Sequence, residues 1–233
     1  MTDEIKTKAI VTRSIPYHES DMLVTLVSPE YGKLTATARG CLKPKAKLRF
    51  ASEILNFGDY VLTGKNGRYV ITECSQIEPF ISITYDIEKF YAASLILDML
   101  QKLSKESNPL LFIHSLECIN DLAYGEKSTD DVVRDFLLVI LIDNGYNFDF
   151  KHCGICGCDI EKDAYYTTLD GIVCNDCKGN GGYFIDVISR KYIAKEINDL
   201  SHDLKNKANM ILADIIFNSL GEKVDINYFT EIL

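Results

Sequence analysis

Hydrophobic and polar residues alternate through the first third of the chain. Val, Ile, Thr and Tyr alternate with polar residues in several short runs, and turn residues separate these runs. Alternation with a period of two predicts strands that bury one face. Five short strands at this spacing predict a small barrel or sandwich. The runs are Lys8–Thr12, Met22–Val27, Lys33–Ala38, Tyr60–Thr63 and Tyr69–Thr72, and Asn66-Gly67 marks a hairpin between the last two.

The pattern changes to a helical period after Glu78-Pro79. Apolar residues then recur at spacings of three and four, which predicts a series of helices. Asn108 and Ser128 are typical helix starts, because their side chains can cap free backbone N–H groups. The helices are expected over 85–103, about 109–124, about 129–144 and, as two or three segments, 184–233. The chain should therefore be an α+β multidomain protein, with a β domain over 1–80 and a helical domain over 81–233.

Composition and the distribution of apolar residues limit the class of the protein and its cellular location. The chain has 233 residues, 47% of them hydrophobic, so it can bury a sizeable core. Its first residues are polar and acidic, unlike a secretory signal. The longest apolar run, Phe136–Ile142, is far shorter than the roughly 20 residues of a membrane span. We expect a cytoplasmic protein with no membrane partner, whose eight cysteines stay reduced and form no disulfides.

Four cysteines form two pairs with the spacing of a zinc site. Cys153 and Cys156 are separated from Cys174 and Cys177 by seventeen residues. Two thiolates three positions apart can face one ion where the chain turns tightly, and glycine permits that turn. Zinc prefers four such ligands in a tetrahedron, and a complete shell leaves no position for substrate. The spacing predicts a structural Zn²⁺ in a module at about 151–182, inside an otherwise all-α domain.

The neighbouring residues leave alternatives open for this cluster. Cys158 could replace one of the four ligands, whereas His152 is expected to be a surface residue. Iron of the rubredoxin type takes the same ligands, and four reduced cysteines without a metal are the remaining possibility. Cys41, Cys74 and Cys118 are isolated, and the last two are expected to be small core residues.

The overall acidity of the chain hides a basic stretch. The formal net charge is −9, which taken alone argues against a nucleic-acid binder. Residues 1–80 nevertheless carry eleven Lys or Arg against nine Asp or Glu, and no acid occurs from Tyr31 to Ser52. Gly40 and Pro44 favour a loop there, and a mobile basic loop suits a phosphate backbone. The candidate DNA-binding residues are Lys33, Arg39, Lys43, Lys45, Lys47 and Arg49.

Aromatic side chains near this stretch would add stacking platforms for single strands. The candidates are Tyr31, Phe50, Tyr60 and Tyr69. The alternative interpretation of the basic stretch is a solvated loop that only keeps the protein soluble.

Motifs of common enzymes are absent from the sequence. It has no Gly-x-x-x-x-Gly-Lys-Ser/Thr, no Gly-x-Gly-x-x-Gly and no His-Glu-x-x-His. The acidic pair Asp130-Asp131 suits a helix start, where negative charge meets the helix dipole. The pair Glu19-x-Asp21 could orient a strand end or form an ion pair with Arg13 or Arg39. The sequence therefore predicts no catalytic residue and no enzyme.

An ordered set of short motifs resembles the RecO family of bacterial recombinational-repair proteins. The resemblance spans nearly the whole chain and keeps its order. The motifs are Glu19-Ser20-Asp21, Tyr31-Gly32-Lys33-Leu34, Ala38-Arg39-Gly40, Lys43-Pro44-Lys45, Asn108–Phe112, Asp143–Tyr146, the two cysteine pairs, Gly181-Gly182 and a helix ending in Phe229.

The resemblance implies an N-terminal OB-fold barrel, a helical domain and a zinc module in which the four cysteines are ligands. It implies binding to single- and double-stranded DNA, with Arg39, Lys43 and Lys45 in the DNA-facing segment, and annealing of complementary strands. It also implies partnership with RecR, contact with the C-terminal tail of single-stranded-DNA-binding protein, and help in loading RecA, all at the nucleoid.

Two other functions are consistent with the residues. A zinc-stabilised protein-interaction scaffold without direct DNA binding would use the acidic helical half and would need no basic face. A hydrolase acting on nucleic acid would need a metal site with an open position, and the sequence has no cluster of carboxylates and histidines to build one.

Overall fold

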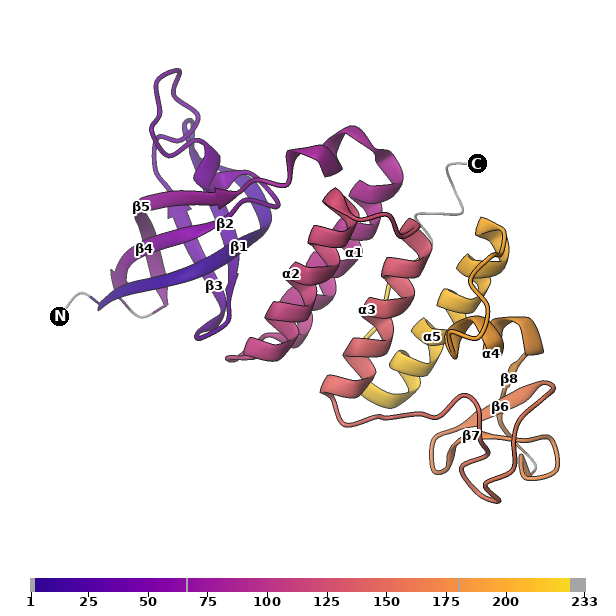
Figure 1. The fold of residues 1–233 in the computed structure, drawn as a ribbon. Helices are drawn as coiled ribbons and strands as arrows, with labels where there is room; N and C mark the ends of the chain where they lie inside the picture. The colour runs from indigo at the N-terminus through magenta and orange to yellow at the C-terminus, as the bar shows by residue number, and fades with distance from the viewer. Residues whose placement is uncertain (1–2, 66, 180, 227–233) are drawn as a thin grey trace. The chain divides into compact units, whose positions relative to one another are not determined.

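The computed structural model describes residues 3–65, 67–179 and 181–226, which belong to two compact units that meet in sequence at Gly125 and Glu126 (Figure 1). The first unit contains a five-stranded sheet and two α-helices, and the second contains three α-helices and a three-stranded sheet. Two predicted features, Asn66 and the helix end at Phe229, lie outside the described residues. Among the described residues, no helix combines the length and the apolar character needed to cross a membrane.

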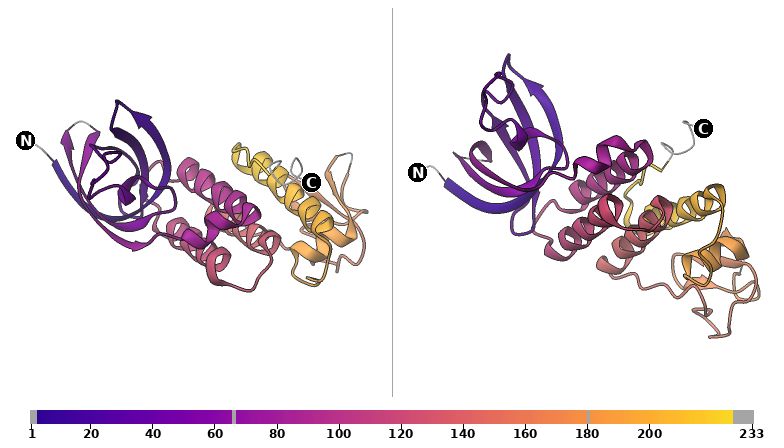
Figure 2. Two further views of the ribbon diagram at one scale, coloured as in Figure 1. Left: turned by 90° about the horizontal axis from the view of Figure 1, so that it is seen from above. Right: turned by 45° about the horizontal axis from the view of Figure 1, so that its top comes forward.

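The five strands of the first unit close into a barrel, and they curve around a common centre in both views of Figure 2. Their order is β1-β2-β3-β5-β4, and β1 pairs with β4 to complete the ring. All neighbours are antiparallel except β3 and β5. This arrangement confirms the predicted OB-fold-like barrel. The strands are β1 (Asp3–Tyr17), β2 (Asp21–Ser28), β3 (Gly32–Ala38), β4 (Phe57–Lys65) and β5 (Arg68–Glu78).

β1 extends beyond the predicted Lys8–Thr12 at both ends. Residues 3–10 pair with β4, whereas residues 10–17 pair with β2. The register with β2 shifts between Val11 and Arg13. Such an irregularity bends a strand. It lies next to Ile10, where β1 passes from pairing with β4 to pairing with β2.

Alternating side chains of the strands fill the interior of the barrel. Removal of these apolar side chains from water is the main stabilising contribution to this core. The long connection between β3 and β4 holds the short 3-10 helix η1 (Phe50–Ser52) and adds buried Cys41 and Ala51 to the same core. The core residues are Ile5, Ala9, Val11, Val24, Leu26, Leu34, Ala36, Ala38, Cys41, Ala51, Tyr60, Leu62 and Ile71.

Two helices complete the first unit, and each begins at a capping side chain. The 3-10 helix η2 (Ile81–Tyr85) leads into α1 (Ile87–Leu103), and α2 (Pro109–Tyr124) follows. The side chain of Asp86 accepts hydrogen bonds from two N–H groups at the start of α1. Asn108 does the same for Leu111 N–H, with Pro109 at the first helical position, as predicted.

The turn between β2 and β3 is attached to the segment that joins α1 to α2. Lys33 N–H donates to the Ser104 carbonyl at 2.8 Å, and the Ser107 hydroxyl donates to the Pro29 carbonyl at 2.9 Å. Gly32 has φ +62°, and a Cβ atom there would collide with the Glu106 carbonyl. The barrel and its two helices are therefore connected by more than the chain itself. The predicted domain boundary after residue 80 stays a prediction.

The second unit combines helices with a small sheet, whose strands are too short to produce a periodic pattern in the sequence. α3 and α5 pack together, and α4 packs on α5. The sheet has the order β7-β6-β8 and lies in the cysteine-rich segment, where no strand was predicted. The elements are α3 (Thr129–Asp143), β6 (Ala164–Thr167), β7 (Gly171–Val173), β8 (Tyr183–Ile185), α4 (Val187–Ile193) and α5 (His202–Leu220).

Candidate functional site

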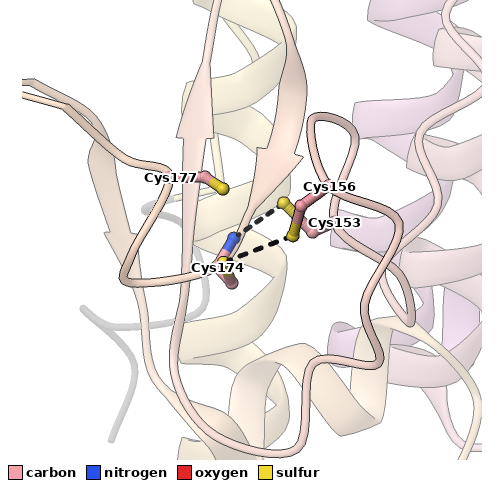
Figure 3. Close-up of side chains that lie close together, drawn as sticks. All are labelled: Cys153, Cys156, Cys174 and Cys177. Atoms are coloured by element: carbon pink, nitrogen blue, oxygen red, sulfur yellow. Dashed lines mark hydrogen bonds between the residues drawn. The ribbon is translucent and has the colours of Figure 1, made fainter.

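The two cysteine pairs meet in the second unit and form one cluster of thiols (Figure 3). The Sγ atoms of Cys153, Cys156, Cys174 and Cys177 all lie within 4.8 Å of one another, so the group could hold a metal ion. The Sγ atoms of Cys156 and Cys174 are 4.0 Å apart. The predicted ligand set is thus brought together by the fold, although its members come from segments far apart in the chain.

Backbone hydrogen bonds build the two turns that carry the thiols. In the first turn, Gly157 N–H donates to the Cys153 carbonyl at 2.9 Å, and Gly157 has φ +71°. In the second turn, which follows β7 directly, Cys177 N–H donates to the Cys174 carbonyl at 3.1 Å. A further bond of 2.8 Å joins Gly154 N–H to the Ile172 carbonyl and holds the two turns side by side.

The geometry of the four sulfurs fits a tetrahedral ion. Zinc–sulfur bonds of about 2.3 Å place the sulfurs of a tetrahedron about 3.8 Å apart, close to the separation of the Cys156 and Cys174 sulfurs. Cys153 is buried, Cys174 and Cys177 are half-buried and Cys156 is exposed. Four thiolates would complete the coordination shell, so the chemistry of this donor set is that of a structural site with no open position.

The surroundings favour the ionised form of the most buried thiol. Burial raises the pKa of Cys153, but backbone N–H groups of Cys156 and Cys174 outweigh burial and lower the pKa to about 6. The Cys174 N–H lies 3.4 Å from the Cys153 sulfur. In contrast, interaction with the Cys156 and Cys174 thiols raises the pKa of Cys177 above its usual range. Thiol ligands bind a metal in their deprotonated form, so metal binding at this cluster would release the remaining protons.

Cys158 and His152 border the cluster in different ways. Cys158 is exposed and does not belong to the group of four, although hydrogen bonding to Cys156 raises the pKa of the Cys158 thiol to about 12. His152 uses both ring nitrogens on carboxylates, at 2.7 Å from Asp149 and 3.2 Å from Asp159. His152 is therefore a surface residue, in agreement with the sequence analysis.

The predicted basic stretch forms an irregular loop between β3 and η1, which we call the basic loop and define as residues 39–49. Cys41 is fully buried, and Leu48 packs on the barrel core, so the loop is anchored at both ends. Its cations face solvent, and no ion pair joins any of them to an acid within the described part of the chain. These exposed cations are Arg39, Lys43, Lys45, Lys47 and Arg49.

Lys33, the sixth candidate, stands apart from the basic loop. It lies at the start of β3, whereas Arg39 follows the end of that strand. At about 3.3 Å per residue, the two positions are about 20 Å apart along the strand. Lys33 is exposed, but it does not belong to the cluster of cations formed by the loop.

The aromatic candidates do not form an exposed platform beside the basic loop. Tyr60 is 1% exposed in the barrel core, and Phe50 and Tyr69 pack against that core. Tyr31 is 48% exposed, but it lies in the turn between β2 and β3, next to Lys33. The strand register directs Tyr60 and Tyr69 to the core, and η1 places Phe50 against it; the residue types alone do not indicate these positions.

The acidic pairs have structural partners. The Asp21 carboxylate accepts a hydrogen bond from Gly40 N–H at 2.7 Å, so it orients the start of the basic loop rather than an arginine. The Asp130 carboxylate lies 2.8 Å from His202, and Asp131 forms an ion pair with Lys205 at 2.9 Å. These partners are too distant in sequence for a local motif to have revealed them.

Comparisons with known proteins agree with this architecture. The family model described as "Recombination protein O N terminal" matches residues 1–80, which contain the barrel. The model described as "Recombination protein O C terminal" matches residues 84–199, which contain the cysteine cluster.

Curated relatives match along most of the chain. DNA repair protein RecO of Clostridium novyi is 31% identical over 232 residues, which cover 94% of this chain and 90% of the relative. The protein of the same name from Acetivibrio thermocellus is 27% identical, over 97% of this chain and 91% of the relative. That from Listeria monocytogenes is 28% identical over 74% of this chain and 68% of its own length. The chain therefore belongs to the RecO family.

Proposed function

We propose that this protein is a DNA-binding recombination mediator that acts in DNA repair and catalyses no covalent step. Membership of the RecO family supports a role in repair and recombination. The observation that carries DNA binding is the basic loop: five exposed cations without acidic partners in the described chain, mounted on an OB-type barrel. Neutralised phosphates release counterions, which makes such binding favourable and dependent on salt.

The proposed action is annealing of complementary strands. Cations of the basic loop hold the phosphates of one strand, and their positive charge lowers the repulsion from a second strand. The rest of the chain is acidic, with fourteen Lys or Arg against twenty-five Asp or Glu beyond residue 80. Like charge would keep DNA away from that part and leave it to protein partners. The partners that we propose are RecR, the C-terminal tail of single-stranded-DNA-binding protein and, through loading, RecA at the nucleoid.

The same proposal assigns a structural Zn²⁺ to Cys153, Cys156, Cys174 and Cys177. The sulfur separations and the complete set of four thiols support zinc. When bound, the ion would supply folding free energy to its module rather than chemistry.

Fluorescence anisotropy of a labelled single-stranded oligonucleotide tests DNA binding by the whole protein. We expect binding that weakens steeply between low and moderate salt. The variant K43E/K45E/K47E/R49E should lower the affinity at low salt by about two orders of magnitude or more and should flatten the salt dependence.

A matched pair of variants distinguishes the effect of the basic loop on affinity from the effect of net charge. K43E/K45E and K151E/K162E change the net charge equally, and Lys151 and Lys162 are exposed in the second unit. Loss of affinity in both variants would mean that total charge, rather than the basic loop, controls binding.

The acidity of the chain beyond residue 80 favours a second candidate, a zinc-stabilised interaction scaffold without direct DNA binding. If the unmodified protein fails to bind the oligonucleotide at low salt, DNA binding by the isolated chain is wrong and the scaffold is the better account.

A further inference from the structure

The turn between β1 and β2 carries an exposed pair of aromatic rings, which are not among the stacking residues predicted from the sequence. Tyr17, the last residue of β1, is 43% exposed, and His18 follows it on the surface. The ring centroids are 4.1 Å apart. His18 has φ +57°, a left-handed conformation that is uncommon for residues other than glycine. The turn therefore holds two adjacent rings at the surface of the barrel.

Hydrogen bonds attach this turn to the start of the basic loop. The Ser20 carbonyl accepts from Leu42 N–H at 3.1 Å, and the Asp21 carboxylate accepts from Gly40 N–H at 2.7 Å. Ser20 and Asp21 follow the aromatic pair by two or three residues, and Gly40 and Leu42 lie between the first two loop cations, Arg39 and Lys43. The aromatic turn and the start of the basic loop therefore adjoin each other on the barrel, although about twenty residues separate them in sequence.

The outer face of β1 extends the same surface. Arg13, Ile15 and Tyr17 alternate along the strand and are all exposed, so they share one face. Ile15 pairs with Leu23 of β2, which is half-buried on that face. A cation, an apolar side chain and an aromatic ring therefore follow one another toward the basic loop.

We propose that Tyr17 and His18 form a stacking site for an unpaired base of single-stranded DNA, whose phosphates are neutralised by the cations of the basic loop. The inference rests on the proposed DNA binding and adds to it a preference between strand types. Every base has a flat face that can stack on an aromatic ring, independent of its sequence. In a duplex those faces are covered by neighbouring base pairs, so the aromatic pair contributes to the binding of single strands alone.

The two acids of the turn have opposite effects on this arrangement. The Asp21 carboxylate is directed to Gly40 N–H, so it supports the loop. Glu19 is exposed and would repel a phosphate that approaches the rings. E19Q is therefore expected to strengthen binding of single strands by a few fold at low salt.

A single tryptophan can report directly on stacking, because the chain contains none. In Y17W, saturating oligo(dT) should quench the tryptophan fluorescence strongly, whereas a hairpin duplex of the same charge should not. Y85W serves as the control: Tyr85 in η2 is 85% exposed, so collisional quenching would affect it more than position 17. Equal quenching in both variants, or none in Y17W while anisotropy shows bound DNA, would overturn the stacking site and leave DNA binding intact.

Affinities of ring variants give an independent measure. Y17A should weaken the binding of single strands about tenfold and change the affinity for duplex less than twofold, whereas Y17F should bind like the unmodified protein. An unchanged melting temperature of Y17A shows that the barrel is intact. Equal losses for single strands and duplex, or no loss for either, would contradict the proposal. Failure of the unmodified protein to bind DNA would overturn this inference together with the proposed function.

Discussion

The barrel and the cysteine module are stabilised by different kinds of interaction. The barrel closes a ring of five strands, the longest of them fifteen residues, around a core of buried aliphatic side chains. The module has strands of four, three and three residues. A sheet of that size buries too little apolar surface to be stable alone. The four thiols and the backbone hydrogen bonds around them fix its two turns. Tyr166 and Tyr183 attach its sheet to α5 through Ser219 and Asp214.

The stability of the barrel and that of the module therefore depend on different interactions. The stability of the barrel comes from the area removed from water, which is spread over many side chains. The module depends in addition on one cluster of four thiols, so that metal binding and folding are coupled there. The candidate DNA-binding surface lies on the barrel and should remain when the module is lost.

Loss of the metal ligands is expected to have the largest effect. In C153S/C174S, the module should lose its metal and its ordered strands, because structural zinc sites supply on the order of 10 kcal/mol or more of apparent binding free energy. Elemental analysis and amide hydrogen exchange of residues 151–185 measure both changes. The exchange rates of the barrel strands should stay unchanged.

C158S is the matched control for this prediction. It removes the exposed fifth thiol and should retain a full equivalent of metal. Metal loss in C158S, or a full equivalent in C153S/C174S, would show that the ligand set differs from the four clustered thiols.

A cavity in the barrel core should have the next largest effect and should leave the metal in place. Leu62 is fully buried, and L62A should lower the free energy of unfolding by about 2–5 kcal/mol. Denaturant unfolding measures the loss, and L169A, at a leucine that is 93% exposed, should change stability by less than about 0.5 kcal/mol. A release of metal in L62A would mean that the two regions are not independent.

The smallest expected effect concerns a carboxylate that links helices of the second unit. Asp135 is 18% exposed and lies 3.0 Å from Arg134, 2.9 Å from Lys195 and 3.1 Å from Lys127. Burial raises the pKa of Asp135, but the hydrogen bond from Lys195 and the charge of Arg134 outweigh burial and lower it. D135N should therefore cost about 1–3 kcal/mol at pH 7.

The lowered pKa of Asp135 determines how its contribution to stability changes with pH. Because the folded pKa is below the unfolded value of about 3.9, the contribution is present above that pH and disappears as the pH falls through the folded pKa. The stabilities of D135N and the unmodified protein should converge below about pH 4. D199N, at an exposed aspartate of the same unit, should change the free energy of unfolding at pH 7 by less than about 0.5 kcal/mol. A difference for D135N that stays constant with pH would contradict the electrostatic explanation.

Sequence patterns predicted the elements that are determined by residues close to one another in the chain. The helix starts at Asn108 and Ser128 are confirmed as caps, because capping depends on residues within one turn. The five strands are confirmed because their alternation reflects a buried and an exposed face. The cysteine pairs were predictable because ligand spacing is set by the reach of a tight turn.

Features that depend on register or on distant partners could not be predicted. Tyr60 has the residue type of a stacking platform, but its place in β4 directs it to the barrel core. Tyr17 is identified only when the hydrogen bond between Leu42 and Ser20 shows which turn adjoins the basic loop. The strands of the module escaped prediction because segments of three or four residues carry no measurable period.

The double pairing of β1 also has a consequence for synthesis of the protein. β1 can form its hairpin with β2 early, but its first half has no partner until β4 (Phe57–Lys65) has emerged from the ribosome. β3 likewise waits for β5 to make its parallel pair. Until then the nascent chain exposes strand edges that can pair with other chains. The free edges of β1 and β3 are thus covered only after the chain up to residue 78 has been synthesised.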